Sequence, residues 1–319
     1  MALMFKGVVL LLTLFCLKPA TGVSALLPVN SPLPPSHAFD DPGKQAAVQK
    51  AGKRLALEFK AKGFIFGAPI LFRSFKSMEV PKILTRPGMS AEKIKDEWKH
   101  ASGEGKLELW VQDDDGHFRK FRTYSVCGME GLPGPKRNEN DYMSPEGFYE
   151  ISPGTLDPNS WMRLSIDVGY PNAYDIGNRA KGRSGAGNAI KIHGACVTEG
   201  CLAMNDDQID EIYAVVSKSL NRNVWSNGSV YKIPFYSFPF PLSPENLKKL
   251  DTDTLRNLSS VINRDHSTEF DVLKFWTHIQ IGYEYFELER SAPDVSVQKT
   301  LGGVEYQFGR PSSELVQKK

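Results

Sequence analysis

A histidine and a cysteine that could act together in covalent catalysis lie close in the sequence, with seven residues between His193 and Cys201. A cysteine attacks a carbonyl as its thiolate, and a neighbouring imidazole can accept the thiol proton. His193 ends a short apolar run, and the loop that follows is long enough to fold both side chains toward one point. Gly200 allows the backbone to approach closely, so the Cys201 amide could stabilise an oxyanion. The pattern predicts a cysteine nucleophile with a histidine base.

Three other interpretations of this segment remain open from the residues alone. His193, Cys196 and Cys201 could bind a metal, but no second ligand cluster accompanies them and a structural zinc site usually takes four protein ligands. Cys196 and Cys201 could instead form a disulfide in an oxidising compartment, or all three residues could be structural. We expect no metal and no cofactor.

The elements that must position this segment have mainly β character. Residues 106–112 alternate between apolar and polar side chains, and an acidic, glycine-ended turn separates them from a second strand-like run. Several short strands between glycine- and proline-rich turns predict a mainly β (α+β) catalytic domain over residues 64–204. The strands are expected at residues 64–72, 106–112, 118–126, 149–151, 163–168 and 189–193.

The flanking regions have a different character. Residues 26–63 form a proline-rich lead-in followed by an amphipathic helix over residues 45–62. Residues 205–290 are expected to form a helical extension, with helices at 205–220 and 270–288. Prolines interrupt residues 231–241, which predicts an edge strand or no strand there. Residues 291–319 are polar and are expected to form a loose tail.

The N-terminus has the pattern of a secretory signal peptide over residues 1–25. Lys6 precedes an apolar run of eleven residues, and Val23 and Ala25 are the small residues of a cleavage site. Such a run is too short to span a bilayer, and no later segment is long and apolar enough to do so. Cys16 would leave with the signal, so Cys127, Cys196 and Cys201 would remain and at least one thiol would stay unpaired.

Charge argues against nucleic acid as a partner. The formal net charge is +2, and removal of Lys6 and Lys18 with the signal peptide would bring it near zero. A near-neutral chain lacks the basic surface that nucleic-acid binding requires. We therefore expect an exported protein that neither binds nucleic acid nor spans the membrane after cleavage.

Several motifs together resemble the L,D-transpeptidase catalytic domain family, also called YkuD-type. That family has His-Gly, then Ser or Thr, one further residue, and Gly-Cys; this chain has His193-Gly194 and then Thr198-Glu199-Gly200-Cys201. Residues 140–147 resemble the family's Gly-Asp-x-x-Thr-Pro-Glu-Gly block, and residues 134–136 and 170–175 match further landmarks in order. The short spacing and Cys196 are similar to the YafK-like murein L,D-transpeptidase branch. Glu199 and Ala203 depart from the broader family, in which many members have His and Arg there.

The resemblance implies a β-sandwich catalytic domain with flanking helices and a mechanism at its centre. Cys201 would attack a carbonyl of a peptidoglycan stem peptide with His193 as base, and Gly194 or Thr198 would orient the imidazole. Amides around Gly200 would receive the oxyanion.

The resemblance also implies substrate contacts, partners and a location. Tyr174 and Asp175 would contact substrate. Arg183 could do so as well, as a positive charge near the site in place of the Arg that Ala203 replaces, or could be a solvated loop residue. An amine would release the thioester in transfer and water would release it in hydrolysis, so the alternative is an amidase that frees stem residues or a peptidoglycan-attached lipoprotein. A non-catalytic wall-binding protein is a lesser alternative. The expected location is the periplasm.

Overall fold

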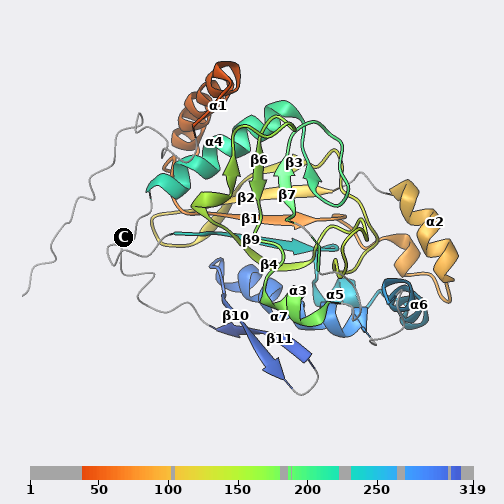
Figure 1. Ribbon diagram of the computed structural model, residues 1–319. Coiled ribbons are helices and arrows are strands. Elements are labelled where there is room, and N and C mark those ends of the chain that lie inside the picture. The colour runs from red at the N-terminus through yellow and green to blue at the C-terminus, as the bar shows by residue number, and fades with distance from the viewer. Residues whose placement is uncertain are drawn as a thin grey trace, which may run out of the picture. The chain divides into compact units, whose positions relative to one another are not determined.

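Five strands form the central sheet of the computed structural model, in the order β3-β2-β1-β9-β4 (Figure 1). Side chains alternate between the two faces of this sheet. Ile70 and Phe72 of β1 face one hydrophobic core, and Leu71 and Phe75 face another. The sheet is therefore buried on both faces, because separate layers cover it. Its strands are β1 (Ile70–Phe75), β2 (Lys106–Gln112), β3 (Phe118–Ser125), β4 (Gly147–Ile151) and β9 (Ile233–Phe238).

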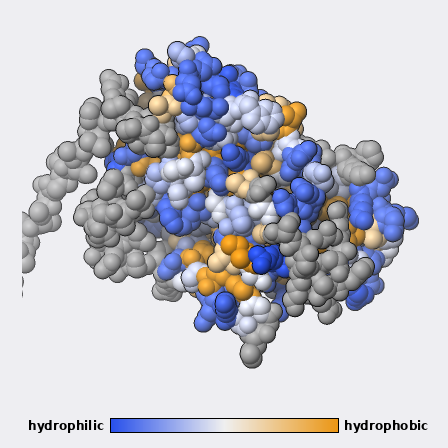
Figure 2. Space-filling model, viewed as in Figure 1, coloured by the Kyte–Doolittle hydropathy of each residue, from blue (hydrophilic) through white to orange (hydrophobic). Residues whose placement is uncertain are grey.

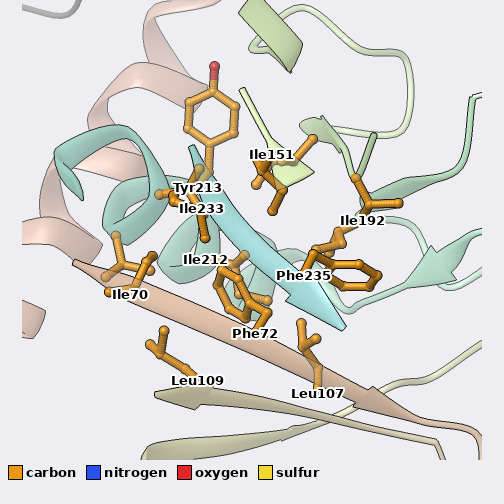
Figure 3. Close-up of a cluster of buried hydrophobic side chains, with 14 of the residues drawn as sticks. Ile70, Phe72, Leu107, Leu109, Ile151, Ile192, Ile212, Tyr213, Ile233 and Phe235 are labelled. Atoms are coloured by element: carbon orange, nitrogen blue, oxygen red, sulfur yellow. The ribbon is translucent and has the colours of Figure 1, made fainter. Parts of the chain in front are cut away.

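A second sheet of four short strands carries the candidate site. Its order is β5-β6-β7-β8, and it shares the first core with the central sheet. Figure 3 shows Ile192 of this sheet facing Phe235 and Ile151 of the central one, so the two sheets pack as a sandwich. The expected α+β class is confirmed. The strands are β5 (Leu156–Asp157), β6 (Ser165–Asp167), β7 (Lys191–His193) and β8 (Leu202–Ala203).

Helices α1 (Pro42–Ala61) and α4 (Asp206–Arg222) pack together on the first core (Figure 1). The Asp41 side chain caps α1 by accepting from the amides of Gly43 and Lys44. Both helices match the predicted ones to within three residues at each end. Since α4 and β9 contribute to the same core as β1, the expected boundary after residue 204 does not separate two cores.

The second core lies on the opposite face of the central sheet. Trp276, Ile279 and Phe286 of α7 are buried there, as the helical spacing of residues 270–288 predicts. Figure 2 shows largely hydrophilic surface over α1, and hydrophobic surface where α7 and the neighbouring hairpin lie. The remaining helices are α2 (Ala91–Ala101), α3 (Ala173–Asn178), α5 (Pro244–Leu247), α6 (Thr252–Ile262) and α7 (Val272–Glu289), with single 3₁₀ turns at Lys82–Leu84 and Pro153–Thr155.

Two expectations about the C-terminal part are wrong. β9 is a central strand, parallel to β1 and antiparallel to β4, rather than an edge strand. β9 pairs with β1 only from Phe235 onward. Pro234, which has no N–H to donate, precedes this pairing and therefore removes no hydrogen bond from it. The supposed loose tail contains a hairpin of β10 (Asp294–Thr300) and β11 (Gly303–Gly309), in which Val295 and Val297 pack on the second core.

The structure describes residues 38–101, 105–179, 186, 187, 189–222, 231–263, 270–300 and 303–309. All of them belong to one compact unit spanning residues 32–318. The expected signal peptide lies outside the described residues. None of the helices within these ranges has the length and apolar character needed to cross a bilayer.

Candidate active site

His193 ends β7 and Cys201 immediately precedes β8, and these two strands are parallel neighbours. The register pairs Ile192 with Leu202, both buried in the first core. Continued by one residue, it sets Cys201 beside Lys191, whose amide donates to Cys201 Sγ at 3.4 Å. Cys201, just before β8, packs against the first core, whereas the His193 side chain lies on the face of β7 opposite to that of Ile192.

The His193 ring has one nitrogen bonded and the other free. Nδ1 lies 2.7 Å from the carbonyl oxygen of Gly194, which can only accept, so we assign the ring proton to Nδ1. Nε2 is buried and has no hydrogen-bond partner among the described residues. Burial lowers the pKa of His193, and the Gly194 bond opposes this only in part. The ring is thus a neutral base with an available lone pair at Nε2.

Cys201 carries a free, half-buried thiol. Burial raises the pKa of this thiol, while the Lys191 amide and the charges of Lys191 and Lys136 pull it back down. A thiol in this condition needs help to ionise, which a neutral imidazole can give. The described hydrogen bonds include none between Cys201 Sγ and His193, although the two residues lie on adjacent segments of the same sheet.

Steric constraints favour glycine at both Gly194 and Gly200. A Cβ at Gly194 would lie 2.9 Å from Asp206 Oδ1 and 3.0 Å from the Met162 carbonyl oxygen. Gly200 has φ of +103°, and a Cβ there would lie 3.0 Å from the Met143 carbonyl oxygen. The absence of a side chain at Gly194 lets the backbone after His193 lie against the start of α4. The positive φ of Gly200 permits the turn that leads into Cys201.

Thr198 has a different position from the one expected as an alternative. Its hydroxyl donates to the Cys201 carbonyl oxygen at 2.9 Å, so it braces the turn before the nucleophile. The orienting contact to His193 comes from Gly194 instead. Of the two orienting groups considered, the structure brings only the Gly194 carbonyl to the ring.

Cys127 and Cys196 form a disulfide, which leaves Cys201 as the free thiol. The alternative pairing of Cys196 with Cys201 is therefore wrong. Cys127 follows β3, and its amide donates to the Ala203 carbonyl oxygen of β8. The bond fastens the loop between base and nucleophile to the end of the central sheet.

Comparison with known proteins decides the family. The sequence model of the L,D-transpeptidase catalytic domain (YkuD) matches residues 105–229. A protein named "Putative L,D-transpeptidase YafK", from Escherichia coli strain K12, is 34% identical over 194 residues, which are 61% of this chain and 67% of that protein. The protein of the same name from E. coli O157:H7 matches equally. The chain belongs to the L,D-transpeptidase family.

A solved structure also resembles this L,D-transpeptidase-family chain. The helical cell shape determining protein Pgp2 from Campylobacter jejuni aligns over 84% of each chain, with 14% sequence identity and a TM-score of 0.33.

Tyr174 and Asp175 of this family member are buried in α3 rather than displayed in an open cleft. Tyr174 stacks on Tyr306, with ring centroids 4.4 Å apart. The Asp175 carboxylate accepts from the Tyr149 hydroxyl and from the Asn172 amide in a capping box. These contacts are structural, so contact with substrate stays a prediction for both. Arg183 lies outside the described residues.

Burial raises the pKa of Asp175 to about 7, which predicts an unusual pH dependence of stability. In the unfolded chain this carboxyl titrates near ~3.9. The folded state therefore binds the proton more tightly, and stability falls as pH rises from about 4 to about 7 and then levels off. Asp175→Asn should remove this loss. Its free energy of unfolding relative to the parent should rise across that window by up to roughly 4 kcal/mol. Urea unfolding at several pH values measures it, and a difference that stays constant would contradict the prediction.

Removal of the disulfide should destabilise the protein. The cross-link spans 69 residues, and closing a loop of that length is worth roughly 4 kcal/mol in the chain-entropy account. Urea unfolding should show this loss for the double variant Cys127→Ser/Cys196→Ser. The parent with reductant is the matched control and should unfold at the same midpoint as the variant. If the urea midpoint of the parent were the same with and without reductant, the stabilising disulfide would be contradicted.

Three charged groups near the thiol were not predicted from the sequence. Lys191 and Asp167 face each other across β7 and β6, and Lys136 lies close enough to influence the thiol. The first two could have been found, because Lys191 is two residues before His193 on one strand and so shares its face. Lys136 lies far away in sequence, within the family landmark of residues 134–136, but that landmark does not indicate its closeness to the thiol.

In the part of the chain that the structure describes, metal-binding side chains do not gather, and one large cavity lies apart from His193 and Cys201. No three His, Cys, Asp or Glu side chains of the described ranges are placed to bind a metal ion. A cavity of about 880 Å³ lies elsewhere, between the central sheet and β10, and neither His193 nor Cys201 is among its described lining residues.

Proposed function

We propose that this chain is an exported cysteine acyl-transfer enzyme that acts on peptidoglycan stem peptides. The observation that carries the proposal is that the free thiol of Cys201 and a neutral His193 with an unpartnered Nε2 lie on adjacent segments of one sheet. Membership of the L,D-transpeptidase family supports the substrate class. The disulfide supports export, because such bonds persist mainly in oxidising compartments such as the periplasm.

In the proposed reaction the proton of the Cys201 thiol passes to His193 Nε2, and the thiolate attacks the carbonyl carbon of a stem peptide bond. Amides around Gly200 receive the oxyanion. The bond to the leaving amine then breaks as His193 returns the proton to it, which leaves a thioester on Cys201. An acceptor amine that attacks this thioester gives transfer, and water gives hydrolysis.

The acceptor decides between transpeptidase and hydrolase, and product analysis tests both. The mature protein is incubated with tetrapeptide muropeptides and a D-amino acid, and separately with lipoprotein-bearing peptidoglycan in water labelled with heavy oxygen. Transfer should give exchanged or bridged peptides without the label, whereas hydrolysis should place one labelled oxygen on the released carboxylate. Cys201→Ala is the control. A folded protein with a reactive Cys201 that yields neither product would overturn the substrate class and leave a wall-binding role.

A further inference from the structure

Cys201 lies at one end of a row of three neighbouring residues that crosses the second sheet. Asp167 on β6 is paired with Lys191 on β7, and the amide of Lys191 donates to Cys201 Sγ at 3.4 Å. Paired residues in a sheet project to the same face. The row of residues therefore runs Asp167, Lys191, Cys201 across three adjacent segments, with the first two side chains on one face of the sheet.

The pairing brings Asp167 and Lys191 close together. Gly194 N donates to the Leu164 carbonyl oxygen across the same two strands, which marks a hydrogen-bonded pair. Hydrogen-bonded and non-hydrogen-bonded residue pairs alternate along an antiparallel ladder. The pair Asp167–Lys191 lies three positions from the hydrogen-bonded pair Leu164–Gly194, so it is a non-hydrogen-bonded pair. Side chains approach most closely at such pairs. Asp167 Oδ1 is fixed in turn by the Gly169 amide at 2.8 Å.

The ammonium group of Lys191 is the part of this row that can act on the nucleophile. A positive charge near a thiol favours the thiolate, and a carboxylate favours the thiol. Lys191 lowers and Asp167 raises the pKa of the Cys201 thiol, in agreement with their signs and places. Lys136, on the segment between β3 and β4, also lowers the pKa of the thiol, and His193 lies two residues beyond Lys191 on β7.

We propose that Lys191 is a positioning residue for the nucleophile: its amide and ammonium stabilise the Cys201 thiolate, and the negative charge of Asp167 moderates the effect of that ammonium. The inference rests on the proposed role of Cys201. It adds that the thiolate has two supports, His193 as proton acceptor and Lys191 as fixed positive charge. The S–H bond breaks, its proton goes to His193 Nε2, and the electron pair stays on sulfur beside the ammonium.

Alkylation of Cys201 by iodoacetamide as a function of pH tests the proposal on the whole protein. Lys191→Met removes the charge but keeps the amide bond to sulfur, so the rate profile should move to higher pH and the rate at neutral pH should fall roughly three- to tenfold. Asp167→Asn keeps an acceptor for Gly169 and should move the profile to lower pH. Lys191→Arg should restore the parent profile. Lys232→Met is the matched control, because this exposed lysine of the segment before β9 pairs with Glu150 away from the thiol.

Opposite shifts are the decisive feature, since general damage to the β6–β7 pairing would move both variants the same way. A Lys191→Met profile equal to that of the parent, or an Asp167→Asn shift in the same direction as Lys191→Met, overturns the proposal. Salt gives a second test that needs no folded variant. High salt should move the parent profile to higher pH, and a parent profile that ignores salt also counts against Lys191.

The two proposals fail in different ways. Thiol alkylation needs no peptidoglycan, so absence of turnover on stem peptides with the opposite shifts intact overturns the proposed function alone. Turnover by the parent with no effect of Lys191→Met on the alkylation profile overturns the role of Lys191 alone.

Discussion

Cys201→Ala and Cys201→Ser are each expected to abolish turnover of stem peptides, on the order of 10⁴-fold or more, while the protein stays folded. Alanine has no nucleophile, and a serine hydroxyl ionises far less readily than a thiol. The fold should survive because Cys201 is half-buried and the Lys191 amide is its one described polar contact at sulfur. Muropeptide products measured by mass spectrometry, together with thermal unfolding, check both parts.

The disulfide provides the control for this prediction. Cys196→Ser breaks the bond to Cys127 but leaves the thiol of Cys201, so under reducing conditions it should keep most of the activity of the equally reduced parent. Turnover that survives in Cys201→Ala would sink the assignment of the nucleophile. The assignment would also be wrong if Cys196→Ser were as inactive as Cys201→Ser under reducing conditions in which the parent stays active.

His193→Ala should lower the rate of turnover by at least about 10²-fold, the usual contribution of a general base. Burial raises the pKa of the Cys201 thiol, so without the imidazole fewer molecules carry a thiolate at neutral pH. The loss should shrink as pH rises, because solvent hydroxide can then remove the proton. Turnover and iodoacetamide alkylation, each measured against pH, report this behaviour.

His117→Ala is the matched control, because His117 is a histidine in the turn between β2 and β3, away from the thiol. It should leave both profiles unchanged. An alkylation profile that is the same in His193→Ala as in the parent would show that another group activates the thiol.

The part of the site that could be predicted lies in short local patterns. A strand that ends in histidine, followed after a short loop by Gly-Cys, contains both chemical partners within nine residues. The family resemblance depended on motifs of this kind and is confirmed. Helices α1, α4 and α7 were predictable for a similar reason, because an amphipathic stripe is a property of consecutive residues.

The predictions that are wrong concern segments whose pairing and packing partners lie far away in the sequence. Prolines suggested that residues 231–241 avoid a sheet centre, but β9 pairs with β1 from Phe235 onward, and Pro234 precedes that pairing. Val295 and Val297 alternate within an otherwise polar segment, which composition alone predicts to be a loose tail. Tyr306 and Phe308 on the paired strand provide the apolar surface beside them. Local composition does not determine which other strand a strand pairs with, or which residues pack on its faces.

By itself the sequence determined the reactive residue types, the spacing of His193 and Cys201, and the faces of the main helices, because these depend on residues close along the chain. The tertiary structure decided which cysteine stays free, since Cys127 meets Cys196 only when β3 and the catalytic loop come together across 69 positions. It also decided that Gly194 orients His193, that Asp175 is buried, and that Lys191 faces Asp167 beside the thiol. Each of these depends on strand register and packing between distant segments, and the free energy that selects one register belongs to the whole core rather than to any local stretch.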